Sequence, residues 1–274
     1  MIRDITVGQY YPSNSILHHL DPRLKLVGTF LYIISMFLFE EFYGFIPVAV
    51  FLVSVIALSK VPLRIILRGL KAVIVLLLFT ATFNLFLTPG EVIFKIGFLK
   101  ITVEGIRFAV FMSVRLTFLI LGSTLMTFTT TPNQLTDGLE KLLWPLRHIK
   151  VPVHEIAMMM SIALRFIPIL FEETDKIMKA QMARGADFES GGILKRAKGL
   201  VPLLVPLFVS AFRRANDLAM AMEARCYRGG EGRTKMKPLR YKKRDSLSYL
   251  LLFTYLAIVI FVGIFEEQFP MWRM

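Results

Sequence analysis

Long apolar runs constrain this 274-residue chain more than any other feature of its sequence. The bilayer core requires about 20 mostly apolar residues per spanning helix, and five stretches approach that length. Their approximate bounds are Leu24 to Phe39, Tyr43 to Ser59, Leu70 to Thr88, Ile106 to Thr130 and Ser246 to Phe265. A hydrophobic fraction of 55% also exceeds that of an ordinary soluble domain. We therefore predict an all-α integral membrane protein with about five transmembrane helices.

Basic residues between the predicted spans indicate which side of the membrane each connection faces. The connection between the first two spans carries only Glu40 and Glu41. The connection between the second and third spans carries only basic charges, at Lys60, Arg64, Arg68 and Lys71. We expect a multi-pass protein of the cell membrane, surrounded by the lipid bilayer, with a cytoplasmic N-terminus. After five spans the C-terminus lies outside the cell.

The predicted spans divide the chain into three regions. Residues 1–131 form an N-terminal transmembrane region with four spans, and residues 246–274 form a C-terminal transmembrane helix. Residues 132–245 concentrate the basic residues of a chain whose net charge is +13, and five spans place them on the cytoplasmic side. The basic run of residues 233–244 is explained by attraction to anionic lipid and by its effect on topology.

The central region is predicted to form one short and two long cytoplasmic-side helices. Their approximate bounds are Pro132 to Arg147, Val153 to Arg184 and Ile193 to Arg225, with Gly191 and Gly192 breaking the chain between the long helices. Each long helix begins apolar and ends charged. The apolar halves have about 13 to 15 residues, short of a span, so we expect them at or just inside the cytoplasmic face. Internal prolines are expected to bend them, at Pro168, Pro202 and Pro206.

The two long helices end in similar tripeptides, Ala183-Arg184-Gly185 and Ala224-Arg225-Cys226. An arginine between small residues exposes five hydrogen-bond donors on a narrow stalk, which suits an acidic groove on a partner. Alternatively, the cation interacts with the helix dipole, worth about 0.3 to 1 kcal/mol, and glycine is the usual helix stop. The residue pattern alone leaves both interpretations open.

These tripeptides resemble the signature motifs of the transmembrane T component (EcfT, related to CbiQ) of energy-coupling factor transporters. Segments 15–25 (SILHHLDPRLK), 130–132 (TTP) and 163–168 (ALRFIP) also resemble that family, and the match runs along essentially the whole chain. Cys226 is a departure, because the second motif often has glycine there. The family comprises subunits of ABC-type importers for vitamins and transition-metal ions.

The resemblance implies a coupling subunit that transmits conformational change from two cytoplasmic ABC-type ATPase subunits to a substrate-binding membrane S component. Arg184 and Arg225 would dock into grooves on the ATPases. The apolar halves of the coupling helices would hold the S component, and flexible methionines there could repack against different partners. We assign to this second surface Met158, Met159, Leu164, Phe166, Pro168, Leu203, Leu204, Pro206 and Phe208.

Sequence motifs for catalysis, metal binding and nucleic-acid binding are missing. The chain has no Gly-x-x-x-x-Gly-Lys-Ser/Thr loop, Gly-x-Ser-x-Gly elbow or His-Glu-x-x-His pair. Its single cysteine and four histidines lack metal-ligand spacing. No aromatic platform for nucleic acid is visible. We expect a non-enzyme without a cofactor or metal of its own, so that ATP and magnesium are bound by partner ATPases.

Other interpretations remain open at the level of sequence. A conventional ABC importer permease would line its own substrate path, and an intramembrane enzyme or ion-driven carrier would need neither partner. Arg115, inside the fourth apolar run, is a functional candidate by its costly position, or it snorkels or pairs with Glu104 or Glu91. The sequence does not identify the transported substrate, the S component or whether the two ATPases are identical.

Overall fold

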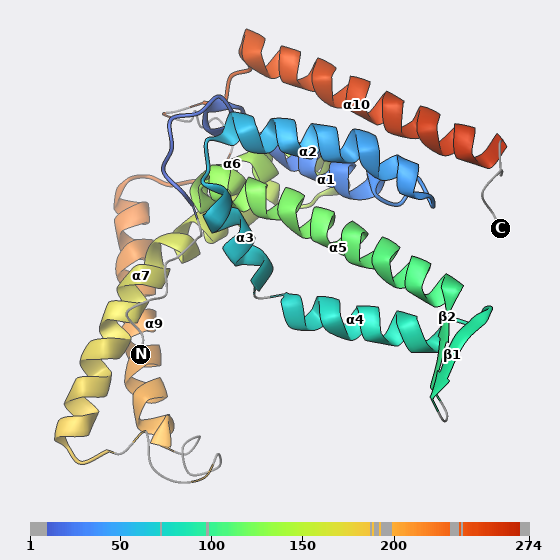
Figure 1. The fold of residues 1–274 in the computed structure, drawn as a ribbon. Helices are drawn as coiled ribbons and strands as arrows, with labels where there is room; N and C mark the ends of the chain where they lie inside the picture. The colour runs from blue at the N-terminus through green and yellow to red at the C-terminus, as the bar shows by residue number, and fades with distance from the viewer. Residues whose placement is uncertain are drawn as a thin grey trace. The chain divides into compact units, whose positions relative to one another are not determined.

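The computed structural model describes residues 10–71, 73–96, 99–186, 188, 192, 199–230, 236 and 238–268. The chain divides into two compact units. The bundle unit contains Gln9–Gly138 and Leu239–Met274, and the helix-pair unit is built mainly from Leu139–Pro238. Most of the described residues are α-helical (Figure 1). The predicted all-α membrane fold is therefore confirmed.

The bundle unit is organised around one long central helix. Its elements are η1 (Leu17–His19), α1 (Pro22–Ser35), η2 (Phe42–Gly44), α2 (Phe45–Ser59), α3 (Leu63–Lys71), α4 (Ile74–Leu87), β1 (Val92–Ile96), β2 (Leu99–Thr102), α5 (Val103–Thr129) and α10 (Lys243–Gln268). Helix α5 contacts α1, α2, α3 and α4, while α10 packs against α1 and α2. The short antiparallel hairpin of β1 and β2 leads directly into α5. Helix α6 (Pro132–Leu142) crosses the boundary between the two units.

The helix-pair unit contains η3 (Trp144–Ile149), α7 (Val153–Ala183) and α9 (Val201–Ala224). Helix α7 runs through Pro168 as a single element, and Pro206 likewise lies inside α9. Pro202, by contrast, occupies the first turn of α9, where the missing N–H has no intrahelical partner to lose. The expected bend at Pro202 is therefore wrong. Gly191 lies outside the described residues.

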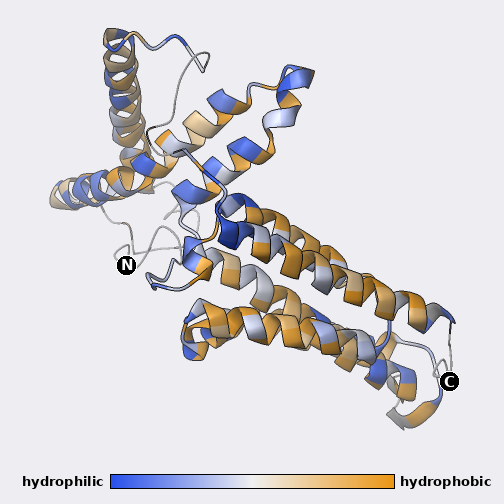
Figure 2. Cartoon of the chain, turned by 90° about the horizontal axis from the view of Figure 1, so that it is seen from above, coloured by the Kyte–Doolittle hydropathy of each residue, from blue (hydrophilic) through white to orange (hydrophobic). Residues whose placement is uncertain are grey.

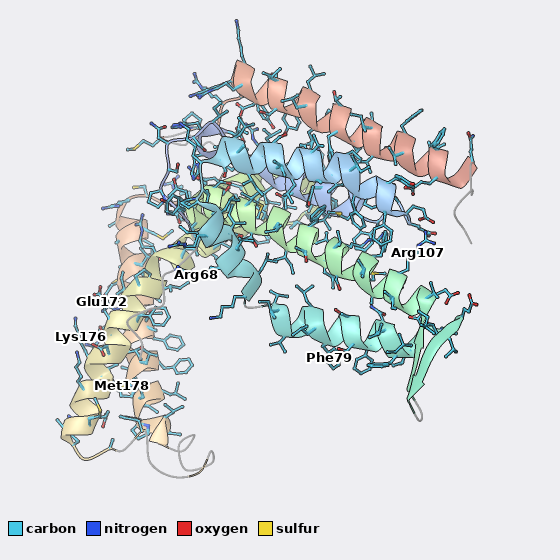
Figure 3. All side chains as sticks on the ribbon, in the orientation of Figure 1. Arg68, Phe79, Arg107, Glu172, Lys176 and Met178 are labelled. Atoms are coloured by element: carbon cyan, nitrogen blue, oxygen red, sulfur yellow. The ribbon has the colours of Figure 1, made fainter. Side chains whose placement is uncertain are left out.

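Four helical segments within the described residues are long and apolar enough to cross a membrane: Phe42–Ser59, Val103–Thr129, Val153–Ala183 and Lys243–Glu266. The bent pair Leu63–Lys71 and Ile74–Leu87 makes a fifth if it is counted as one span. Hydrophobic residues predominate along the bundle helices (Figure 2). Exposed apolar side chains on α4, including Phe79 (Figure 3), fit a lipid-facing surface. The described chain therefore has the spans of a multi-pass membrane protein.

The set of spans differs from the predicted set in two places. Helix α1 has only 14 residues because the chain turns after Ser35, so it falls short of a full span. Helix α7, predicted to be too short in its apolar half, contains an apolar window of 18 residues. The apolar character of that window continues into the half that also carries charges. The hairpin at Val92–Thr102 was not predicted either.

Aromatic and polar contacts hold the bundle helices together at its centre. Tyr32 of α1 donates its hydroxyl to the Phe118 carbonyl of α5 at 2.9 Å, and the hydroxyls of Ser35 and Tyr255 hydrogen-bond at 2.6 Å. The ring of Tyr255 stacks on Phe51 of α2, with centroids 4.1 Å apart. Such interhelical hydrogen bonds satisfy polar groups that lipid cannot. These contacts link all the longer helices of the bundle except α4.

A buried carboxylate joins the start of α1 to the start of α10. Asp245 is 3% exposed, and its oxygens accept the backbone N–H of Asp21 at 2.9 Å and of Lys242 at 2.7 Å. Asp21 in turn caps α1 by accepting the N–H of Arg23, whose guanidinium binds the same carboxylate through two nitrogens. Pro22 occupies the first helical position, where its fixed φ favours the helix. This polar joint explains why segment 15–25 combines charge with a helix start.

His18 and Lys25 extend the polar joint to the end of α5. Lys25 donates to the Thr129 carbonyl at 2.8 Å. His18 Nε2 lies 2.9 Å from the Tyr11 carbonyl and must donate to it, so Nδ1 accepts the Ser15 hydroxyl at 2.6 Å. Burial lowers the pKa of His18, which favours this neutral tautomer. Segment 15–25 therefore serves as an internal connector of the bundle.

Replacing Asp245 with alanine should destabilise the bundle by about 1 to 3 kcal/mol, because the buried N–H of Asp21 loses its acceptor. Asp245→Asn should destabilise the bundle less than Asp245→Ala, because its amide oxygen still accepts one of the two N–H groups. Thermal unfolding of the purified protein in detergent measures the change. Asp217→Asn, at an exposed aspartate of α9, is the control and should leave the midpoint unchanged. Equal midpoints for Asp245→Ala and wild type would contradict this role.

Candidate functional site

The two predicted arginine tripeptides end their helices with the same backbone geometry. Arg184 is the C-cap of α7, and the next two N–H groups return to the carbonyls of Met182 and Gln181, each at 2.9 Å. Arg225 is the C-cap of α9, where Cys226 and Tyr227 donate to Glu223 and Met222 at 2.8 and 3.0 Å. This double hydrogen-bond pattern is the Schellman motif, which satisfies the last carbonyls of a helix.

The residue after each arginine has a left-handed backbone. Gly185 has φ of 87° and Cys226 has φ of 56°. Glycine adopts this conformation freely, whereas a residue with a Cβ atom is disfavoured there by roughly 1 to 2 kcal/mol. The turn requirement explains the glycine at one site. At the other site, the same requirement makes Cys226 conformationally unfavourable, although both turns form.

Both arginine side chains, Arg184 and Arg225, are exposed. The guanidinium groups of Arg184 and Arg225 have no hydrogen bond or ion pair with any residue that the structure describes. The turn fixes the backbone under each guanidinium, so its donors remain available for a partner. Ala183 and Ala224, one residue earlier, are also exposed. The structure therefore brings each tripeptide to an accessible helix end.

Helices α7 and α9 pack against each other in opposite directions (Figure 1). Gln181, near the end of α7, approaches the Pro202 carbonyl at the start of α9 at 3.4 Å. Nearer the middle of both helices, Arg214 pairs with Glu173 at 2.8 Å. The apolar half of each helix therefore lies beside the charged half of the other. Sequence did not reveal this antiparallel arrangement.

The antiparallel packing places Arg184 and Arg225 at opposite ends of the helix pair. Helix α9 has 24 residues, which at a rise of about 1.5 Å per residue make it about 36 Å long. Because Gln181 lies beside the start of α9, Arg184 is separated from Arg225 by roughly that helix length. One groove cannot hold both side chains. The helix pair therefore exposes its two arginine ends at separate points.

Arg225 lies in a cleft of about 660 Å³ between the first half of α7 and the end of α9. Arg165 and Arg228 line the same cleft. The remaining lining residues are apolar or neutral: Met158, Ser161, Ile162, Leu218, Met222, Cys226, Tyr227 and Gly229. Three guanidinium groups without an acidic side chain among the lining residues favour an anionic ligand group. Sequence reasoning assigned no role to Arg165 or Arg228. Arg228 lies near Arg225 along the chain, but only the fold brings Arg165 to them.

The residues assigned to an S-component surface differ in their exposure. Met159, Leu204 and Phe208 are exposed, as is Pro168, whereas Leu203 is only 6% exposed and faces inward. The others are half-buried: Met158, Leu164, Phe166 and Pro206. Met158 lies in the arginine cleft.

An exposed apolar stripe on α9 was only partly identified from sequence. Val205, Phe208, Val209 and Phe212 line one shallow groove and are all exposed, with Phe208 at 62%. Their spacing of i, i+3, i+4 and i+7 is the signal that would have found them. Large exposed apolar stripes mark protein or membrane contacts.

On α7, Glu172 and Lys176 lie at the outer edge, as Figure 3 shows, while Met178 is half-buried.

Arg115 of α5 has a different partner from those predicted. Its guanidinium donates to the Phe39 carbonyl at 2.6 Å and lies over the Phe111 ring, 4.5 Å from the centroid. The predicted pairing with Glu104 or Glu91 is therefore wrong. Arg115 instead binds a backbone carbonyl left free by the turns after α1. Arg107 of α5, labelled in Figure 3, forms an ion pair with Glu41.

Comparison with known proteins identifies the class and then the family. The bundle and helix pair define a multi-pass, all-helical membrane protein, and residues 13–236 match the family described as CbiQ, cobalt transport protein. The chain is 55% identical to the energy-coupling factor transporter transmembrane protein EcfT of Ruminiclostridium cellulolyticum over 247 residues, covering 90% of this chain and 92% of the relative. The corresponding protein of Clostridium kluyveri is 54% identical over 262 residues (95% and 97%). That of Bacillus subtilis is 49% identical over 263 residues (96% and 99%).

This chain therefore belongs to the CbiQ/EcfT family, the transmembrane components of energy-coupling factor transporters. The predicted family is confirmed. Relatives named as transporter transmembrane proteins also agree with a subunit that works as part of a larger complex. Within the described residues, no group of three His, Cys, Asp or Glu side chains could hold a metal ion.

Cys226→Gly should stabilise the turn after α9 by up to about 1 kcal/mol, because glycine relieves the left-handed strain. Hydrogen–deuterium exchange of the Cys226 and Tyr227 amides should slow up to about fivefold, since these N–H groups close the turn. Gly185→Ala should have the opposite effect at the end of α7. Cys226→Ser is the matched control, because it keeps a Cβ atom of similar bulk. Unchanged exchange in both glycine-site variants would contradict the strain argument.

Proposed function

We propose that this chain is the coupling subunit of an energy-coupling factor importer for vitamins or other micronutrients. It transmits conformational change from two cytoplasmic ABC-type ATPase subunits to a substrate-binding S component. The observation that carries the proposal is the pair of exposed arginines, each at a Schellman helix end, at opposite ends of one antiparallel helix pair. ATP and magnesium are bound by the ATPases, and this chain supplies no catalytic group.

Two docking points about one helix length apart match two partner subunits better than one. Each guanidinium offers a planar set of donors that binds a carboxylate through two parallel hydrogen bonds. At the second point, Arg165 and Arg228 add positive charge to the same cleft. An acidic groove on an ATPase subunit fits this chemistry, and the charge also speeds association.

The antiparallel helix pair supports force transmission because polar contacts join its two helices in the middle and at one end. Glu173 and Arg214 join the middle of the pair, and Gln181 reaches Pro202 at one end. A change in the separation of two ATPase subunits acts on opposite ends of the pair and rotates one helix against the other. Packed helices transmit such shifts because their interfaces do not deform continuously.

The apolar stripe of Val205, Phe208, Val209 and Phe212 is the best-supported surface for the S component. It lies on the same helix that ends at Arg225, so motion at the docking point reaches it directly. An apolar surface suits an interchangeable membrane partner because it makes few directional bonds. The coupling helices and N-terminus face the cytoplasm and the C-terminus lies outside, as the basic residues near the spans favour.

The double variant Arg184→Glu/Arg225→Glu should lose both ATPase subunits during affinity purification from gently solubilised membranes. Reversing a paired charge typically costs about 2 to 5 kcal/mol per site, or about 30-fold or more in affinity. Each single variant should keep partial binding through the remaining arginine. The measurement is the quantity of P-loop ATPase recovered per tagged chain.

Lys176→Glu is the control, because it reverses an exposed charge on α7 about two helical turns before Arg184. This control should recover wild-type amounts of ATPase. Equal amounts of the double variant and wild type in the membrane fraction exclude an insertion defect. Full complex assembly and transport by the double variant would refute the proposed coupling function.

Phe208→Ala/Phe212→Ala should reduce recovery of the small hydrophobic S component at least tenfold while the ATPases remain bound. Truncating two exposed aromatic side chains removes apolar contact from the stripe without touching either arginine turn. Quantitative mass spectrometry of the purified complex measures both partners. Phe79→Ala, at an exposed aromatic residue of α4, is the control. Loss of S component in the control alone would place this surface on the bundle instead.

A further inference from the structure

Helix α3 is a short basic helix between two apolar helices of the bundle unit. It occupies Leu63–Lys71, after α2 ends at Ser59 and before α4 begins at Ile74. One of its faces packs inward: Ile66 is 1% exposed and belongs to the buried core, and α3 contacts α5. A Cβ atom on Gly69 would lie 3.3 Å from the Thr124 side chain, so the approach to α5 is close. The position of α3 on the bundle is therefore well defined.

A second face of α3 exposes large apolar side chains. Leu63 is 60% exposed and Leu67 is 55% exposed, and their i, i+4 spacing places them side by side. Exposed apolar residues also lie at both ends of the segment, at Leu58 on α2 and at Ile74 and Val75 on α4. The leucines thus continue an apolar surface that the neighbouring helices present to lipid.

The third face of α3 is basic. Arg64, Arg68 and Lys71 are all exposed and fall within an arc of about 60° on a helix of 3.6 residues per turn. Figure 3 labels Arg68 on this helix. Lys60 adds another exposed cation just before α3. Among the residues that the structure describes, none of these four cations forms a hydrogen bond or ion pair.

The surrounding sequence supplies no compensating negative charge. From Phe42 to Gly90 the chain contains no aspartate or glutamate. The basic face therefore attracts anions from outside the chain, and it lies beside leucines that favour the hydrocarbon boundary. An amphipathic helix with these two faces adjacent lies in the membrane interface, with its cations at the level of the phosphate groups.

We propose that α3 is an interfacial binding site for anionic phospholipid headgroups. Arg64 and Arg68 hold lipid phosphates through paired N–H donors, and Lys71 contributes a point charge. Leu63 and Leu67 insert among the acyl chains beside the same lipids. Lipid is the favoured ligand over an acidic protein because exposed apolar surface continues along the chain on both sides of α3. The proposal does not depend on the coupling function.

A tryptophan at position 67 can report which lipids surround α3. The chain has two tryptophans, so Leu67→Trp is made in a Trp144→Phe/Trp272→Phe background. The full chain is reconstituted in vesicles of phosphatidylglycerol and phosphatidylcholine at equal mole fractions. Either lipid carries brominated acyl chains, which quench fluorescence on contact. Unaltered circular dichroism and a single elution peak establish that the reporter is folded.

We expect brominated phosphatidylglycerol to quench the reporter more strongly than brominated phosphatidylcholine, and high salt should reduce the difference. Arg64→Gln/Arg68→Gln should bring the ratio of the two association constants toward one, with about a fivefold loss per arginine. Lys176→Gln/Lys179→Gln, which removes two exposed cations from α7, should leave the ratio unchanged. Native mass spectrometry of the chain with its natural tryptophans, counting retained phosphatidylglycerol, gives the same comparison without the reporter.

Equal quenching by the two lipids would overturn the proposal, because it would leave the basic residues with a topological role only. Absence of quenching by either lipid would also overturn it, because α3 would then lie away from the bilayer. The single, exposed Cys226 separates the two effects of the arginine variant. These effects are loss of lipid binding and inversion of the chain in the membrane. If Arg64→Gln/Arg68→Gln acts on lipid binding, labelling of Cys226 by a membrane-impermeant maleimide should be unchanged. A loss of lipid preference that appears only in inverted molecules would refute the site.

Discussion

The bundle unit depends on one buried carboxylate that joins segments 224 residues apart in sequence. Asp245 accepts the N–H of Asp21 at the start of α1 and the N–H of Lys242 before α10. Polar groups at helix starts need a partner wherever water is excluded. By satisfying both at once, Asp245 fixes where α1 and α10 begin relative to each other. The contacts of Tyr255 with α1 and α2 then follow along the helices.

The helix-pair unit follows a different principle, because the same helix ending is repeated at both of its ends. In the Schellman turns at Arg184 and Arg225, backbone N–H groups satisfy the last carbonyls of each helix. Neither guanidinium is therefore needed to cap its own helix. Antiparallel packing places the two similar tripeptides at opposite ends of the helix pair. It also collects Arg165, Arg225 and Arg228 in one cleft, which makes the two ends chemically unequal.

Much of the fold could be predicted where a helix is long and has a clear stop. The predicted helix from Val153 to Arg184 agrees with α7 to within one residue, because Gly185 marks its end. The end of α1 was missed, because residues 36–39 are as apolar as the helix before them. The turn there is stabilised from outside, by Arg115 of α5 binding the Phe39 carbonyl. No local pattern could have shown that contact.

The sequence by itself determined the membrane class, most of the apolar spans, the two arginine helix ends and the family. Each of these depends on residues that are close along the chain, so composition, periodicity and motif were sufficient. Only the tertiary structure decided that α7 and α9 run antiparallel, that Arg115 binds a carbonyl and that Asp245 holds Asp21. Those contacts join residues far apart in sequence, and their geometry depends on how whole helices pack. The basic face of α3 belongs to both levels: its charges were visible in sequence, but packing on α5 settled which face stays exposed.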